Sequence, residues 1–272
     1  MTTRSVKLRL LKTSTRDWLN RVTAPIVGAC AVISCWAAYV VLSGVPPYIL
    51  PGPGAVINTL ISDWAILGRA LWVTTKTTVV ALLLAAAGGG CAAVILAQSR
   101  SLETLLSPIM VTIQVMPIVA IAPLILIYAP TPWIAQLICA LLVTFFPIML
   151  NVLQGLKSAD RHHADLLKTY NASRWQTLIY LKLPSALPSF LAGLKIGGGL
   201  ALVAAVVGEF AAGQAGTNAG LAFRLLEAQY RLNMPRLFAC LVLLAILGAI
   251  IFGLISKMSE IALRRWHVSE QQ

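Results

Sequence analysis

Charge is scarce in this sequence, and acidic residues are the scarcest part of it. Only 11% of the 272 residues are charged, 58% are hydrophobic, and the mean hydropathy is +0.84. Soluble domains carry about 45–50% apolar and about 25% charged residues, so a soluble core cannot bury this excess. The composition therefore excludes a soluble globular protein and indicates an integral membrane protein.

The chain also lacks the groupings that carry catalysis or hold a metal. Each of its five cysteines lies inside an apolar run, without the paired or CxxC spacing of a disulfide framework or metal site. His162 and His163 are adjacent rather than one helical turn apart, which disfavours joint metal ligation. There is no catalytic Cys/His, Ser/His/Asp or paired-carboxylate constellation and no G-x-x-x-x-G-K-[ST] phosphate loop. We expect no metal site, no cofactor and no enzymatic activity in this chain.

The net charge of +12 could indicate a nucleic-acid partner, but no basic patch interleaved with aromatic residues is present. Lys and Arg in a membrane protein mark its cytoplasmic loops. With the N-terminus inside, fifteen of the 21 Lys and Arg residues lie on the cytoplasmic side and five outside, with Lys195 in a span. We therefore predict no nucleic-acid partner and two cytoplasmic termini.

Six apolar runs are long enough to cross the hydrocarbon core, which needs about 20 residues per helix. They are Pro25–Leu42, Thr78–Ala97, Ile109–Tyr128, Ile134–Leu153, Leu187–Ala212 and Leu237–Ile255. Pro117, Pro123 and Pro147 remove backbone donors from the third and fourth runs and should kink or interrupt them. The segment Leu105–Val115 could instead form a short surface helix. A further surface helix is expected outside the membrane over Val56–Lys76, after a Pro- and Gly-rich turn.

These runs predict an all-α integral membrane protein with six transmembrane helices. Its domain spans residues 25–260, between a basic cytoplasmic tail at 1–24 and a cytoplasmic tail at 261–272. No internal repeat of 20–50 residues is evident, which argues against a duplicated architecture.

Residues 158–184, here called the polar loop, separate two of the apolar runs. Ser158 can cap a helix that runs to Tyr170, with an apolar face of His163, Leu166, Leu167 and Tyr170.

Asn171 tolerates the left-handed conformation that a chain reversal requires. Ser173 and Gln176 have capping-box spacing and should begin a second helix, which Pro184 and Pro188 should stop. Two amphipathic helices of this kind suit either an interfacial connector or a docking element for a soluble partner.

The polar loop also resembles the EAA loop of ABC importer permeases, in which E-A-A is followed by a Gly and then by I-x-L-P. The matching positions are Asp165-Leu166-Leu167, Asn171 and Leu181-Lys182-Leu183-Pro184. Asp replaces Glu, two Leu replace two Ala, and Asn replaces Gly, so the docking face differs from the family pattern.

Residues 48–267 are similar to permeases of the nitrate, sulfonate and taurine importer group, which also includes transporters of thiamine-precursor pyrimidines. The segments that carry this similarity are 49–53 (ILPGP), 116–124 (MPIVAIAPL), 145–148 (FFPI), 193–196 (GLKI) and 208–210 (GEF).

The resemblance implies a type I ABC importer fold in the bacterial inner membrane. It implies a homodimer, two copies of a cytoplasmic ATPase that hydrolyse the ATP, and an extracytoplasmic solute-binding protein. The residues it assigns to ATPase coupling are Asp165, Leu166, Leu167, Tyr170, Asn171, Leu181 and Pro184. A stand-alone secondary carrier or channel is the alternative function.

Four residues are candidates for the translocation pathway. Gln114, Met116 and Pro117 lie on the interrupted third run, where backbone carbonyls could face a hydrated path. Glu209 is an acid near the outer end of the fifth run, where an ionisable group is either functional or solvated at the interface. Gly193 and Gly197 form a G-x-x-x-G pair that allows close helix approach, within one subunit or between two.

Overall fold

The computed structural model describes residues 23, 27–213 and 216–264, and every regular element in this part of the chain is helical. Its elements are a helix over Val27–Ser43, α2 (Pro53–Ser62), α3 (Trp64–Gln98), α4 (Arg100–Val115), α5 (Ile118–Tyr128), α6 (Pro132–Lys157), α7 (Arg161–Thr169), α8 (Arg174–Thr177), the π-helical turn η1 (Leu178–Lys182), α9 (Leu183–Ala212), the 3₁₀ turn η2 (Gly216–Asn218), α10 (Leu221–Tyr230) and α11 (Met234–Leu263). The predicted N-terminal tail, apart from Thr23, and residues 265–272 of the C-terminal tail lie outside the described residues.

Four of the described helices are long and apolar enough to cross a membrane. These are α3, α6, α11 and the continuous helix Arg174–Ala212, which joins α8, η1 and α9 and is called the rod below. The bent pair α4 and α5 makes a fifth if it is counted as one span. An all-helical membrane protein with four or five candidate spans is thus confirmed, and the count of six stays a prediction.

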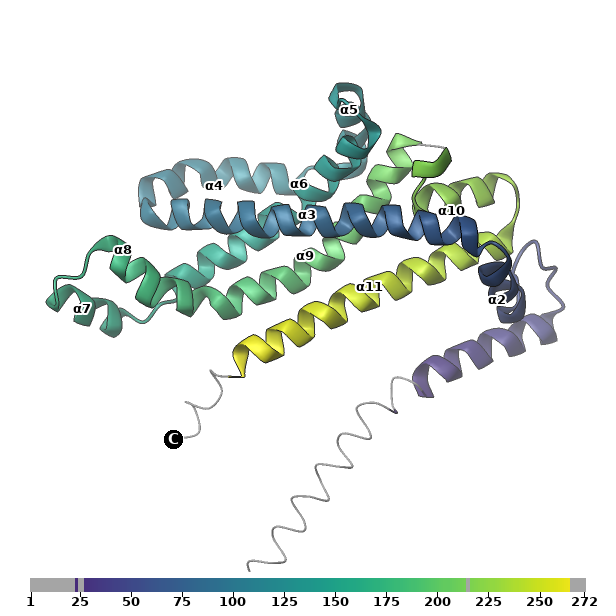
Figure 1. Cartoon of the computed structure of the whole chain (residues 1–272), viewed down its shortest axis with the longest axis horizontal. Coiled ribbons are helices and arrows are strands. Elements are labelled where there is room, and N and C mark those ends of the chain that lie inside the picture. The colour runs from purple at the N-terminus through teal and green to yellow at the C-terminus, as the bar shows by residue number, and fades with distance from the viewer. Residues whose placement is uncertain (1–22, 24–26, 214–215, 265–272) are drawn as a thin grey trace, which may run out of the picture.

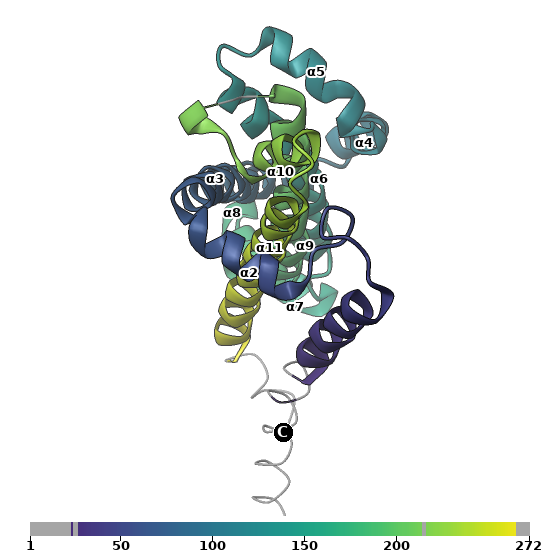
Figure 2. The same ribbon diagram turned by 90° about the vertical axis from the view of Figure 1, so that its right-hand side faces the viewer.

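The helices lie roughly along one long axis, with α7 and α8 at one end and α2 and α10 at the other (Figure 1). Figure 2 shows the helix Val27–Ser43 at the edge of this bundle. It contacts α11 through Trp36, whose ring stacks on Phe238 with 5.7 Å between the ring centroids.

The predicted third span is broken rather than kinked, because α4 and α5 meet at an angle of 96°. Met116 (φ −62°, ψ 127°) and Pro117 (φ −68°, ψ 113°) are both extended. Proline disfavours the helical conformation of the preceding residue and donates no hydrogen bond, so the break falls at this pair. Pro123 and Pro147 lie inside continuous helices, so they do not interrupt the chain.

The predicted surface helix Val56–Lys76 is wrong in its extent. The structure breaks it at Asp63, and the remainder belongs to α3, which is longer than the predicted span Thr78–Ala97. Asp63 Oδ2 accepts a hydrogen bond of 2.7 Å from Arg236 Nε, which ties this junction to the start of α11.

The predicted stop at Pro184 and Pro188 is also wrong, because the rod passes through both prolines. The N–H of Leu183 donates to the carbonyl of Leu178, five residues back, so the turn before Pro184 is wider than an α-helical one. This wider turn accommodates Pro184, which has no N–H to donate, inside the continuous helix. The second helix of the polar loop therefore continues into the predicted fifth span.

Glycines bring α6 and α9 into close contact along a line that we call the glycine seam: Gly155, Gly193, Gly197 and Gly208. A Cβ atom added to Gly155 would lie 2.7 Å from Ser189 Cβ, and one added to Gly208 would lie 3.0 Å from Gln136 Cα. Small residues let membrane helices approach closely enough for dispersion contacts to hold them together. The predicted pair Gly193 and Gly197 thus contributes to packing within one subunit.

We expect Gly155→Ala to destabilise the protein by about 1–3 kcal/mol, because the new Cβ meets atoms that are fixed close to the backbone of α9. Gly199→Ala is the matched control, since nothing lies within 4 Å of its added Cβ and alanine favours a helix by about 0.5–1 kcal/mol. Unfolding in mixed micelles measures both changes. Equal stabilities for the two variants would contradict the close packing at the glycine seam.

Candidate functional site

The polar loop begins with a cap that differs from the predicted one. The carboxylate of Asp160 accepts a 2.8 Å hydrogen bond from the N–H of His162 and caps α7. This bond lowers the pKa of the exposed Asp160 carboxyl from its ordinary value. Ser158, the predicted cap, instead ends α6, where its hydroxyl donates to the carbonyl of Gly155 at 2.9 Å. An ionised carboxylate accepts more strongly than a hydroxyl, which favours Asp160 as the cap.

The chain reversal between α7 and α8 follows the predicted pattern. Asn171 has a positive φ of 54°. Its N–H donates to the carbonyl of Lys168 and the N–H of Ala172 donates to that of Leu167, both at 2.9 Å. These two bonds form a Schellman motif, which satisfies the last carbonyls of the helix.

The predicted capping box at the start of α8 is confirmed. The Ser173 N–H donates to Gln176 Oε1 at 2.7 Å, and the Gln176 N–H donates to Ser173 Oγ at 3.2 Å. Each end of the turn is therefore fixed by hydrogen bonds within the loop itself, and the two helices hold a defined angle.

The tip of the polar loop presents apolar side chains to its surroundings. Leu166 is 54% exposed, Tyr170 is 78% exposed and Trp175 is 63% exposed. Leu167 is half-buried, and Asp165 forms an exposed ion pair of 2.8 Å with Lys168.

His163 does not share that apolar surface in the predicted way, because its Nδ1 lies 3.2 Å from Asp160 Oδ2. Leu181 and Pro184 lie in the rod below the tip. The structure thus places Asp165, Leu166, Tyr170 and Asn171 together at the end of the molecule, while the predicted coupling roles of all seven residues stay predictions.

Two of the candidate pathway residues, Gln114 and Met116, line a cavity of about 240 Å³ at the break between α4 and α5. Leu142, Val143 and Pro147 of α6 and Leu200 of α9 close its other side. Pro117 forms the break, and Glu209 is not among the residues that line this cavity.

Glu209 has a different position: its side chain is buried where α9, α3 and α10 meet. Its Oε1 accepts a 2.7 Å hydrogen bond from the Thr74 hydroxyl, and its Oε2 accepts one of 2.9 Å from the N–H of Ala222. The Thr74 oxygen in turn accepts from the N–H of Leu221 at 2.9 Å.

The first N–H groups of a helix have no partner within it, and they attract negative charge. Glu209 and Thr74 satisfy two of them in α10 and join three helices. Gly220 leaves the space for this carboxylate, since an added Cβ would overlap it.

Thr74 was not among the residues predicted to have a role. The sequence pattern that could have indicated Thr74 is the polar cluster at 74–78 (TTKTT), which lies next to an apolar run.

Residues 88–265 match the family described as binding-protein-dependent transport system inner membrane component. The riboflavin transport system permease protein RibX of Chloroflexus aurantiacus is 36% identical over 86% of each chain. A probable ABC transporter permease protein of Haemophilus influenzae is 30% identical over 82% of this chain and 90% of its own. The formylaminopyrimidine transport permease protein ThiX of Halalkalibacterium halodurans is 31% identical over 80% of this chain and 86% of its own.

Solved structures support the fold. A structure of the inward-facing MetNI methionine ABC transporter superposes with a TM-score of 0.63 at 19% identity, over 74% of this chain and 98% of the other. An amino acid ABC transporter crystallised with histidines gives a TM-score of 0.61 at 15% identity, over 76% of this chain and 97% of the other. The fold is therefore that of the type I ABC importer permeases.

The long apolar helices, the loop at one end and these likenesses define a multi-pass transport permease of the inner membrane. The chain belongs to the family of binding-protein-dependent transport system inner membrane components. It is the permease of an ABC importer and not itself an enzyme, and the ATP is used by an ATPase partner. A binding-protein-dependent system includes both that ATPase and a solute-binding protein.

We expect Glu209→Gln and Thr74→Val each to destabilise the permease by about 1–3 kcal/mol, because each leaves a buried N–H or hydroxyl of the junction without an acceptor. The double variant should lose less than the sum, since both residues serve one network. Unfolding in mixed micelles measures these changes.

Glu260→Gln on α11 is the control, because Glu260 is exposed and the change should stay within about 0.5 kcal/mol. Strictly additive losses from the two buried positions would show that Glu209 and Thr74 are not coupled.

Proposed function

We propose that two copies of this permease form the pathway for a small solute and that a cytoplasmic ATPase docks on the polar loop of each copy. The observation that carries the proposal is the uncovered apolar tip of Leu166, Tyr170 and Trp175 on a frame that its own hydrogen bonds hold rigid. An amphipathic helix with such a face suits a groove on a protein partner. Exposed apolar side chains of this size commonly mark interaction surfaces.

The continuity of the rod supports a direct mechanical route from the ATPase to the membrane. Closure of two ATPase subunits on ATP would displace α7 and α8. Because α8 continues through η1 into α9, the displacement would reach the predicted fifth span without an intervening loop. The glycine seam would pass it to α6, and the Glu209 junction would pass it to α3 and α10. The pathway would then switch from inward- to outward-facing.

The break between α4 and α5 is the part of the chain best suited to contact the solute. Gln114 supplies an amide and Met116 an adaptable apolar group to the cavity there, and the irregular backbone at Pro117 requires polar or protein surroundings. We assign Gln114, Met116 and Pro117 to the pathway. Glu209 is assigned to gating at the outer end rather than to solute contact, because its carboxylate oxygens are already engaged.

The solutes predicted from the sequence form two groups: sulfonates, nitrate and taurine, and pyrimidine precursors of thiamine. The relatives named for riboflavin and formylaminopyrimidine transport are more similar to this chain than those named for aliphatic sulfonates and taurine. This order favours a nitrogen heterocycle delivered by the binding protein.

The distribution of cations supports two cytoplasmic termini. Lys157, Lys168 and Lys182 lie toward the end that carries α7 and α8, while Arg231 and Arg236 flank the connection from α10 to α11 at the other end (Figure 1). The stand-alone secondary carrier would need no docking tip, and the family of this chain works with an ATPase.

We expect the combined change of Leu166, Leu167 and Tyr170 to Glu to abolish the complex with the cognate ATPase. Three carboxylates would have to lose their hydration in an apolar interface, which costs far more than the contact provides. Co-purification from cells that express both subunits measures the complex, and uptake in proteoliposomes measures transport.

The control places Glu at Tyr230 and Leu232, which are 84% and 71% exposed at the opposite end of the molecule. That variant should bind the ATPase as the natural chain does. A stable, transporting complex with the triple variant would rule out the polar loop as the docking site.

A further inference from the structure

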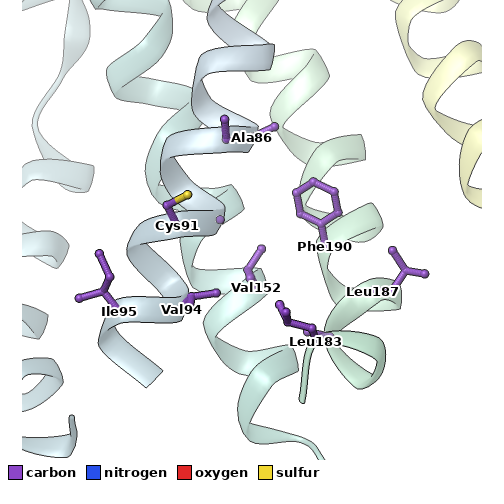
Figure 3. Close-up of a pocket in the computed structure, with 11 residues that line it drawn as sticks. Ala86, Cys91, Val94, Ile95, Val152, Leu183, Leu187 and Phe190 are labelled. Carbon is purple, nitrogen blue, oxygen red and sulfur yellow. The ribbon is translucent and has the colours of Figure 1, made fainter. Parts of the chain in front are cut away.

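An apolar groove runs along the surface where α3, α6 and the rod meet (Figure 3). Its volume is about 570 Å³. The side chains that define it are Val94, Ile95, Val152, Leu183, Leu187 and Phe190. It extends from Ala86 and Phe190 at one end to Ile95 and Leu183 at the other, which is the end nearer the polar loop. All of its lining lies on helices that are long enough to span the membrane.

A basic cavity of about 440 Å³ lies beyond that end of the groove. Lys168, Arg174 and Lys182 line it together with Gln98 at the end of α3. Lys168 forms an ion pair with Asp165. Arg174 and Lys182 form no ion pair with any residue that the structure describes. Three cations therefore converge on a space with no acidic lining residue.

The groove and the basic cavity share the same faces of the same two helices. On α3, Ala87, Cys91 and Val94 line the groove, and Gln98 follows them at helical spacing in the basic cavity. On the rod, Leu178 and Lys182 line the cavity, and Ala186 and Phe190 follow them in the groove at steps of four residues. The two spaces thus follow one another along the same two helices, and together they make a surface that is apolar along the membrane helices and cationic at its end.

We propose that this surface binds one anionic phospholipid, with an acyl chain in the groove and the phosphate held by Lys168, Arg174 and Lys182. Basic pockets between helices at a membrane surface select anionic head groups, and the charge here has the complementary sign. A soluble partner could reach the cations but not the groove, because the groove lies on membrane-spanning segments. The bound lipid would brace the base of the polar loop against α3, independently of which ATPase or solute the permease uses.

The test compares phosphatidylglycerol with phosphatidylcholine of the same acyl chains on the purified full-length permease, by native mass spectrometry. We expect phosphatidylglycerol to bind at least about tenfold more tightly, since three cations favour a head group with a net negative charge. Changing Lys168, Arg174 and Lys182 together to Gln should remove this preference. Gly90→Leu should weaken both lipids by filling the groove, because nothing lies within 4 Å of its added Cβ.

Two matched variants serve as controls. Changing Arg161, Lys257 and Arg264 to Gln removes the same charge elsewhere, and Gly253→Leu adds the same side chain to open space on α11. Both should bind phosphatidylglycerol unchanged.

Three outcomes would overturn the proposal. In the first, the triple Gln variant keeps the preference for phosphatidylglycerol. In the second, inorganic phosphate displaces the lipid fully while Gly90→Leu has no effect, which would indicate a free-anion site. In the third, the triple Gln variant loses the ATPase but not the lipid, which would indicate an acidic segment of that partner.

Discussion

A helix in the hydrocarbon core has no water to satisfy its backbone, so each N–H and carbonyl there must find a partner within the protein. This constraint is most demanding where the polar loop enters the membrane, because Pro184 and Pro188 remove two donors about one turn apart in the rod. The π-helical turn η1 resolves it by widening the helix just before Pro184, so that the chain stays helical rather than ending. The same solution makes the loop and the predicted fifth span one mechanical element.

The rod is packed closely against neighbouring helices near both of its ends. Close to the polar loop, Gly155 of α6 packs against Ser189, and toward the other end Gly208 packs against Gln136. Beyond Gly208, Glu209 attaches the rod to Thr74 and to the start of α10. Helices that are packed in this way move as rigid units, which slide or rotate against one another. In the proposed mechanism, a force applied to α7 and α8 would therefore reach the opposite end of the permease, as alternating access in a partner-driven importer requires.

Local signals in the sequence predict local structure well, and most of the apolar runs and the turn of the polar loop illustrate this. Asn171 and the capping box of Ser173 and Gln176 form as predicted, because their partners lie within three or four residues. Pro184 was misjudged, since proline stops an α-helix unless a wider turn precedes it, and that turn leaves no distinct sequence pattern. The Glu209 junction could not be foreseen, because Thr74 lies 135 residues away and only the folded helices bring the two together. The position of the bend at Met116 and Pro117 was predicted from the sequence. Its angle of 96° was not, because the angle depends on how α4 and α5 pack against α6.

A distance measured along the rod shows whether it is one continuous helix in the working complex. Spin labels at Ile179 and Val203, both exposed, would be separated by about 36 Å in an unbroken helix with a rise of 1.5 Å per residue. Electron–electron resonance on labelled permease diluted with unlabelled copies reports this distance in the complex with its ATPase, with and without ATP. A narrow distribution that is the same in both states is the predicted result. A broad distribution, or a shift of several ångströms on ATP binding, would place a hinge between the two labels and show that the rod is not one rigid element.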